Sequence, residues 1–172
     1  PNHLRAFYGE VFTAILVTLG LLAVSTGSGL LGWSMLVAGV ANTPPAAAGL
    51  ILVILSKSLM TRRLRYFLII GVAGGVIIAE WWLRHGSPFL TGYENNRGFI
   101  TLLPYSGRPG FSYPFFFGIM SILFTFGKGI IFFSPGLLVP IRSLCQRISR
   151  KMNQFYWLSM CFTAGLVIIY AK

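Results

Sequence analysis

The feature that most constrains this chain is a series of long apolar runs, separated by short segments that carry most of the charge. The first run covers about 7–25, and a helix over this length crosses a hydrocarbon core of about 30 Å. Only 10% of the 172 residues are charged, whereas 55% are hydrophobic and the mean hydropathy is +0.75. Too few polar side chains exist to cover a water-facing surface. The chain is therefore predicted to be an integral membrane protein.

The runs predict an all-α, polytopic transmembrane helix bundle that forms a single domain over 1–172. About five to six spanning helices of roughly 20 residues each are expected. They lie at about 7–25, 30–43, 44–59, 66–83, 114–141 and 155–170.

Two adjacent prolines, Pro44 and Pro45, interrupt the second apolar stretch. Because they remove two amide donors, they are expected to break the helix into two short ones. One long kinked helix is the alternative. That alternative would reverse the side of the membrane on which Glu10 lies.

The charge is strongly asymmetric, with 14 Lys and Arg, 3 Asp and Glu, and a net charge of +11. The basic segments 62–65 and 142–151 lie between apolar runs, where the positive-inside rule places them in the cytoplasm. There they contact anionic lipid headgroups. The polar segment 84–113 then forms one long external loop. No basic stripe lies on a soluble module, so nucleic-acid binding is not expected.

Acidic residues are few enough to limit acid–base chemistry to three carboxylates. The chain has no Asp, and its glutamates are Glu10, Glu80 and Glu94. Glu10 lies at the mouth of the first run, where a carboxylate costs free energy unless it faces water or a partner. It is either a substrate-facing group on the external side or an interfacial carboxylate paired with Arg5. For Glu80, an ion pair with Arg84 one helical turn later is favoured.

Two groups of residues are candidates for binding an anion or a sugar. Lys128, between Gly127 and Gly129, needs an anion, a water-filled cavity or a route to the interface. A phosphate site and a snorkelling lysine both remain open. The external loop adds groups that suit a sugar or sugar phosphate, although ordinary loops contain them too: Tyr93, Glu94, Arg97 and Arg108. No cluster of residues has metal-ligand spacing, so no metal is predicted.

Four segments carry a recognisable pattern. Residues 86–93 read Gly-Ser-Pro-Phe-Leu-Thr-Gly-Tyr, and residues 126–138 begin Phe-Gly-Lys-Gly and continue to a Ser-Pro-Gly. Residues 7–10 read Phe-Tyr-Gly-Glu, and residues 38–46 form the proline break. Together they resemble polytopic bacterial membrane proteins of the GT-C glycosyltransferase superfamily, over about residues 3–141. Pro44 stands where that family usually has a basic residue.

The resemblance implies transfer of a sugar from a polyprenyl-phosphate donor at the external face of the bacterial plasma membrane, without a nucleotide sugar. Glu10 would be a catalytic acid near the acceptor, with Lys128, Arg97 or Arg108 near the lipid phosphate. The family's usual catalytic acid lies in a first external loop that has no counterpart here, so we expect a fragment lacking that loop. The competing interpretation is a non-catalytic multi-pass membrane subunit or scaffold of a larger complex. A transporter is the third interpretation, because helices broken by proline are compatible with a substrate site at the membrane midplane.

Overall fold

The computed structural model describes residues 2–87, 114–125, 129–133 and 149–171. Every regular element within these ranges is a helix, so the all-α prediction is confirmed for this part of the chain. The elements are α1 (Asn2–Thr26), α2 (Gly29–Asn42), the 3₁₀ turn η1 (Pro44–Ala46), α3 (Ala47–Thr61), the 3₁₀ turn η2 (Leu64–Tyr66), α4 (Phe67–His85), α5 (Phe115–Phe124), α6 (Ile130–Phe133) and α8 (Arg150–Tyr170).

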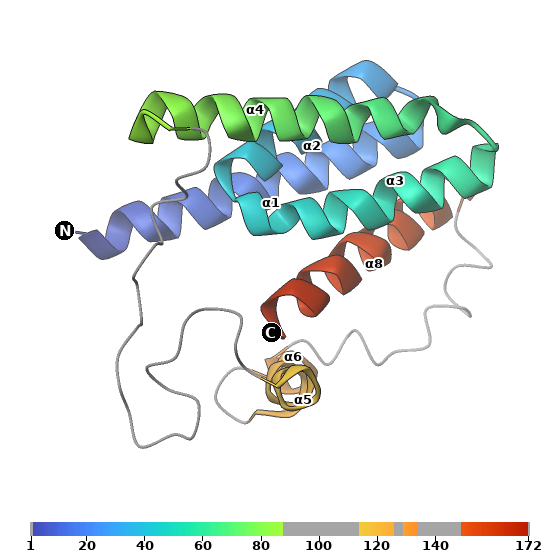
Figure 1. Ribbon diagram of the computed structural model, residues 1–172. Coiled ribbons are helices and arrows are strands. Elements are labelled where there is room, and N and C mark those ends of the chain that lie inside the picture. Colours follow the sequence, from blue (N-terminus) through green and yellow to red (C-terminus); the bar gives the residue numbers. More distant parts are fainter. Residues whose placement is uncertain (1, 88–113, 126–128, 134–148, 172) are drawn as a thin grey trace.

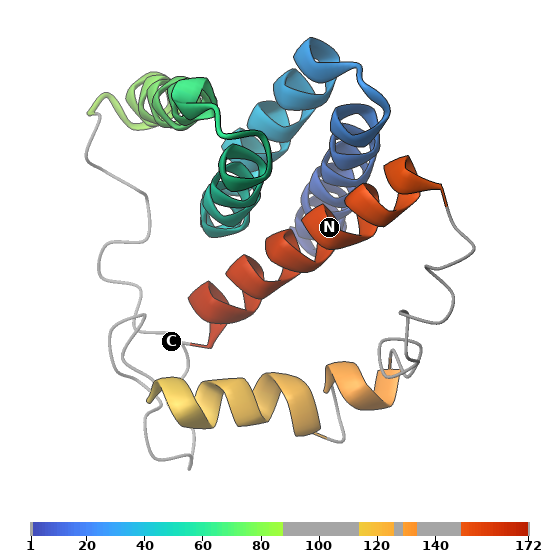
Figure 2. The ribbon, with the colours of Figure 1, turned by 90° about the vertical axis from the view of Figure 1, so that its right-hand side faces the viewer.

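Helices α1 to α4 run back and forth, each antiparallel to the one before it (Figure 1). Helix α8 lies across α1 and α3 (Figure 2). Helix α5 meets the C-terminal end of α8, where Gly118 packs on the backbone of Ala171.

The two prolines reverse the chain, as the sequence predicts. Helix α2 ends at Asn42, Thr43 has φ −135° and ψ 84°, and α3 begins at Ala47 and runs in the opposite direction (Figure 1). The alternative of one long kinked helix is thereby excluded. As a result, the proline turn lies at one end of the bundle and the turn between α3 and α4 at the other (Figure 1). Glu10 lies near the proline turn, since it lines one pocket with Thr43, whereas Arg62 caps the far end of α3.

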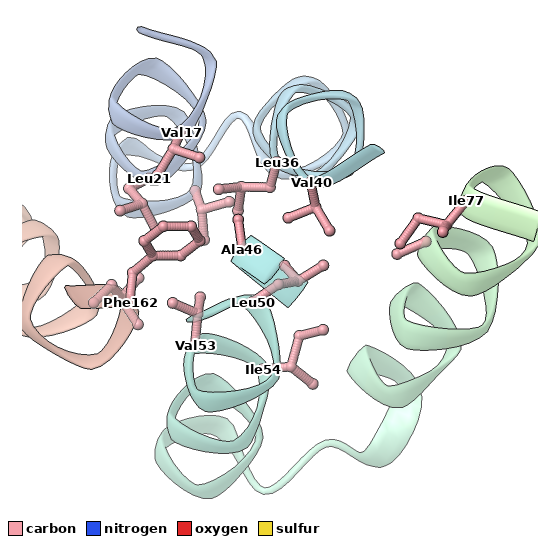
Figure 3. Packing of buried hydrophobic residues seen from close by; sticks show 13 residues of the cluster. Val17, Leu21, Leu36, Val40, Ala46, Leu50, Val53, Ile54, Ile77 and Phe162 are labelled. Carbon is pink, nitrogen blue, oxygen red and sulfur yellow. The ribbon is translucent and has the colours of Figure 1, made fainter. Parts of the chain in front are cut away.

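The core gathers aliphatic side chains from α1 to α4 and α8. Figure 3 shows the Phe162 ring of α8 pointing toward Val17 and Leu21 of α1. Apolar lipid chains offer little hydrophobic driving force between helices, so close packing has to hold such helices together. The most deeply buried large side chains are Leu36, Val40, Leu50, Val53, Ile54 and Leu158.

In two helix pairs, α1 with α2 and α3 with α8, glycines allow the two backbones to come close together. A Cβ added at Gly20 of α1 would lie 2.9 Å from the Gly32 carbonyl oxygen of α2. A Cβ added at Gly165 of α8 would lie 2.5 Å from the Gly49 Cα of α3. Small residues at such crossings let two backbones come into contact, which is a common way to join helices in a bilayer.

Three helical segments of the described residues are long and apolar enough to cross a membrane. These are Pro44–Thr61, Leu64–Leu83 and Arg150–Tyr170. The spans expected at 7–25 and 30–43 fall on the shorter apolar segments Glu10–Thr26 of α1 and Gly29–Asn42. Of the span expected at 114–141, residues 126–128 and 134–141 lie outside the described residues, and the described part contains the short apolar helix Phe115–Phe124. The helical segments are thus compatible with a membrane protein.

Candidate functional site

A pocket of about 340 Å³ opens at the end of the bundle where α1 begins and α8 ends. Helix α1, the proline turn and helix α8 form its walls. Its lining residues are Glu10, Thr13, Ala14, Val17, Thr18, Thr43, Ala46, Phe162, Thr163, Leu166 and Tyr170. The pocket therefore combines one carboxylate and several hydroxyl groups with apolar walls.

Helical spacing explains why these residues share the pocket. On α1, Thr13, Val17 and Thr18 follow Glu10 at intervals of three, seven and eight residues, which place them on one face of a helix. On α8, Leu166 and Tyr170 are four residues apart and also lie on one face. Each helix thus contributes a single continuous stripe to the pocket.

A small hydrogen-bond cluster joins α1 to the proline turn beside the pocket. The Asn42 side-chain amide donates to Thr13 Oγ1 at 2.8 Å, and the Thr13 hydroxyl donates to the Gly39 carbonyl at 3.3 Å. Thr43 Oγ1 lies 2.8 Å from Thr13 Oγ1. Since Thr13 has only one proton and donates it to Gly39, the Thr43 hydroxyl is the donor of this last bond. Buried Thr13 therefore holds the end of α2 against α1.

Glu10 lies exposed at the rim of the pocket, so water and a ligand can both reach its carboxylate. A substrate-facing role for Glu10 and an interfacial one both stay predictions. The Arg5 side chain, which is the alternative ion-pair partner, lies outside the described side chains. Glu80 is half-buried in α4, and the side chain of Arg84 is likewise not among those described.

The other predicted site residues lie outside the described residues: Lys128, Arg97, Arg108, Tyr93 and Glu94. Sequence reasoning did not identify the hydroxyl groups that accompany Glu10. A signal was present for Thr13, because it follows Glu10 by one helical turn. No local signal pointed to Thr163 or Tyr170, because α8 is distant in the sequence and only the fold brings it to the pocket.

The pocket suits an amphipathic ligand with hydroxyl groups. Its carboxylate can accept a proton from a hydroxyl, and its threonines can hydrogen-bond to a polar headgroup. The aliphatic and aromatic walls suit a hydrocarbon chain. The described residues contain no group of three or more His, Cys, Asp or Glu side chains that could hold a metal ion.

Comparison of the chain with protein-family models, with curated proteins and with solved structures finds no match. The chemistry and position of the pocket are therefore the main guides to function.

Proposed function

We propose that this chain is part of an integral membrane glycosyltransferase of GT-C type, which moves a sugar from a lipid-phosphate donor to an acceptor at the external face. One observation supports this proposal above the others. Two segments that resemble the family, 7–10 and 38–46, meet at one pocket, where Glu10 and Thr43 both line the wall.

In the proposed reaction, the acceptor hydroxyl hydrogen-bonds to Glu10. The carboxylate takes the proton as the acceptor oxygen bonds to the anomeric carbon, and the bond from that carbon to the lipid phosphate breaks. Cationic side chains stabilise the departing phosphate. We assign that role to Lys128, Arg97 and Arg108, with Tyr93 and Glu94 holding the sugar.

We further propose five to six spans in a bacterial plasma membrane, with the Glu10 end outside. The basic segments 62–65 and 142–151 would be cytoplasmic and 84–113 would be the external loop. Two groups of cations at one end of the described structure support this orientation. The turn between α3 and α4, with Arg62, Arg63 and Arg65, lies opposite the proline turn, and so does the start of α8, with Arg150 and Lys151 (Figure 1). Positive charge concentrated at one end is typical of a cytoplasmic face.

A second candidate function is that of a non-catalytic subunit in a larger membrane complex. Helix α4 favours it, because a Cβ added at Gly71, Gly74 or Gly75 would meet nothing within 4 Å. Small residues on an open face allow another transmembrane helix to approach closely. A partner that co-purifies in fixed stoichiometry would support this function.

The test is transfer by the full chain in lipid nanodiscs, with a radiolabelled polyprenyl-phosphate sugar and a hydroxyl acceptor. Glu10→Gln removes the base and keeps the shape, so transfer should fall by at least about 100-fold. Glu80→Gln makes the same charge change in α4, which does not line the pocket, and should leave transfer near the wild-type rate. Equal transfer by Glu10→Gln and wild type would exclude the catalytic role of Glu10. A wild-type chain that is inactive alone and active only with a co-purified partner would favour the subunit.

A further inference from the structure

Basic residues concentrate where α3 turns into α4, at the end of the bundle opposite the pocket. We define the α3–α4 corner as Lys57, Arg62, Arg63, Arg65 and Tyr66. The three arginines are exposed and Lys57 is half-buried. The glutamates of the described residues lie far away, on the first part of α1 and the last part of α4 (Figure 1). Several positive charges therefore face the same surroundings without a nearby carboxylate among the described residues.

The backbone of the corner is held in an unusual conformation. Arg62 has φ 53° and ψ 34° and is the sole non-glycine residue with positive φ in the described ranges. Glycine is the usual residue at such a helix end, because a Cβ crowds the neighbouring carbonyl. The Ser58 hydroxyl donates to the Arg63 carbonyl at 3.1 Å and fixes the turn from inside. Residues held in sparsely populated conformations cluster at binding sites.

One guanidinium in the corner has a defined position. Arg65 Cζ lies 5.6 Å from the centroid of the Tyr66 ring, within the range of a cation–π interaction. The Tyr66 ring in turn lies 5.6 Å from the Trp33 ring of α2, with their planes at 43°. This aromatic support limits the freedom of the Arg65 side chain. A planar guanidinium can donate to two oxygens of one phosphate.

Exposed leucine side chains lie beside these cations. Leu59, Leu64 and Leu68 are 79%, 78% and 73% exposed. A small dissolved anion would leave these leucine side chains exposed to water, whereas the acyl chains of a lipid would cover them. Charge next to exposed leucines therefore favours a phospholipid over a free phosphate.

We propose that the α3–α4 corner binds the headgroup phosphate of an anionic phospholipid, whose acyl chains lie along Leu59 and Leu64. The arginines contact the phosphate, and Tyr66 with Trp33 holds Arg65 in place. This site lies at the opposite end of the bundle from the Glu10 pocket, so it is independent of the proposed transferase activity.

The start of α8 provides a matched control, which tests whether any pair of exposed cations at this end of the bundle retains anionic lipid equally well. Arg150 and Lys151 are also exposed and lie at the same end of the bundle. Within the part of the chain that the structure describes, neither side chain lies over an aromatic ring as Arg65 does. Arg63→Gln/Arg65→Gln and Arg150→Gln/Lys151→Gln each remove two charges.

The experiment measures lipid retention by the full chain. The protein is purified in detergent with equal amounts of phosphatidylglycerol and phosphatidylcholine, and bound lipid is counted by native mass spectrometry. Wild type should retain phosphatidylglycerol preferentially. The corner variant should lose roughly fivefold in retention for each arginine removed. The α8 variant should lose clearly less, because the structure gives its two cations no aromatic contact like that of Arg65.

Two outcomes would overturn the proposal in this assay: unchanged retention by the corner variant, or equal losses in the two variants. Displacement of the lipid by millimolar inorganic phosphate would also overturn it, because the site would then be one for free phosphate. If the double variant does not fold, Arg65→Lys supplies the test. It keeps the charge and loses the planar fork, so weaker preference for phosphatidylglycerol supports the site and wild-type preference contradicts it.

Discussion

Gly165 of α8 packs directly on the backbone of Gly49 of α3. A Cβ at Gly165 would lie 2.5 Å from both the Cα and the nitrogen of Gly49, and a Cβ at Gly49 would lie 2.8 Å from the Phe162 carbonyl oxygen. Neither obstacle is the flexible end of a side chain, so a larger residue must push the two helices apart. The crossing lies next to the pocket, because Phe162 belongs to both.

Gly165→Ala should therefore destabilise the protein by about 1–3 kcal/mol, the usual cost of forcing an extra methyl into a packed contact. Thermal unfolding in detergent, followed by circular dichroism, measures the effect. Gly71→Ala is the matched control: its Cβ would meet nothing within 4 Å. It should be neutral or stabilising by up to about 1 kcal/mol, because alanine is the better helix former. Similar losses for both variants would contradict the close crossing.

The Trp157 indole Nε1 donates to Ser56 Oγ at 2.6 Å and links α8 to α3 a second time. Trp157→Phe removes this donor but keeps a large ring, and should cost about 0.6–1.7 kcal/mol, the range for hydrogen bonds between membrane helices. Ser56→Ala should cost a similar amount. In a double-mutant cycle the two losses should not add, because both remove the same bond. Fully additive losses would show that the bond contributes nothing.

Thr13→Val keeps the shape of the side chain and removes the hydroxyl that joins Asn42, Thr43 and Gly39. We expect a loss of about 1–3 kcal/mol in unfolding free energy, because partners at the helix junction lose a hydrogen bond. Thr13→Ser keeps the hydroxyl and should lose less. Thr18 is exposed and donates to Ala14 of its own helix, so Thr18→Val should change stability little. A larger loss from Thr18→Val than from Thr13→Val would contradict the cluster.

Arg62→Gly should stabilise the fold by up to about 1–2 kcal/mol, since glycine adopts the left-handed conformation without the steric cost that an L residue meets. The same change should weaken binding of phosphatidylglycerol, because it removes a cation from the corner. Unfolding temperature and lipid retention measured on one preparation separate the two effects. A less stable Arg62→Gly variant would show that the Arg62 side chain supports the fold instead.

The proposed orientation predicts which positions a membrane-impermeant maleimide reaches in intact cells. In a background with Cys145 and Cys161 replaced by serine, Ser87→Cys should be labelled from outside. Ser28→Cys, in the turn at the basic end, should be labelled only after the membrane is permeabilised. The reverse pattern would place Glu10 in the cytoplasm and exclude an external transferase site.

The sequence predicts local breaks in this protein well and predicts contacts between helices poorly. Pro44 and Pro45 act on their own backbone, so the helix break could be inferred from two residues. Helices that are apolar on all sides carry little information about which side faces a partner. The face of α8 that reaches the pocket through Phe162 and Tyr170 could therefore not be inferred from its sequence.

The same reasoning applies to the candidate site. Glu10 could be identified because a carboxylate near an apolar run is rare and costly. The spacing of Thr13 from Glu10 places it on the same helix face, but its role at the junction of α1 and α2 could not be inferred before its partners at Gly39 and Asn42 were known. The crossing at Gly49 and Gly165 depends on two glycines 116 residues apart, among the 20 in the chain.

The proline turn also has a consequence for hydration. Because Pro44 and Pro45 carry no amide hydrogen, the carbonyls of Val40 and Ala41 have no helical donor four residues later. At membrane depth, a carbonyl that lacks this donor must be satisfied by another polar group. We expect water to enter the bundle beside the turn and to solvate these oxygens. The bilayer would then be thinned locally at this end, and a polar headgroup could reach Thr43 without first crossing a dry hydrocarbon layer.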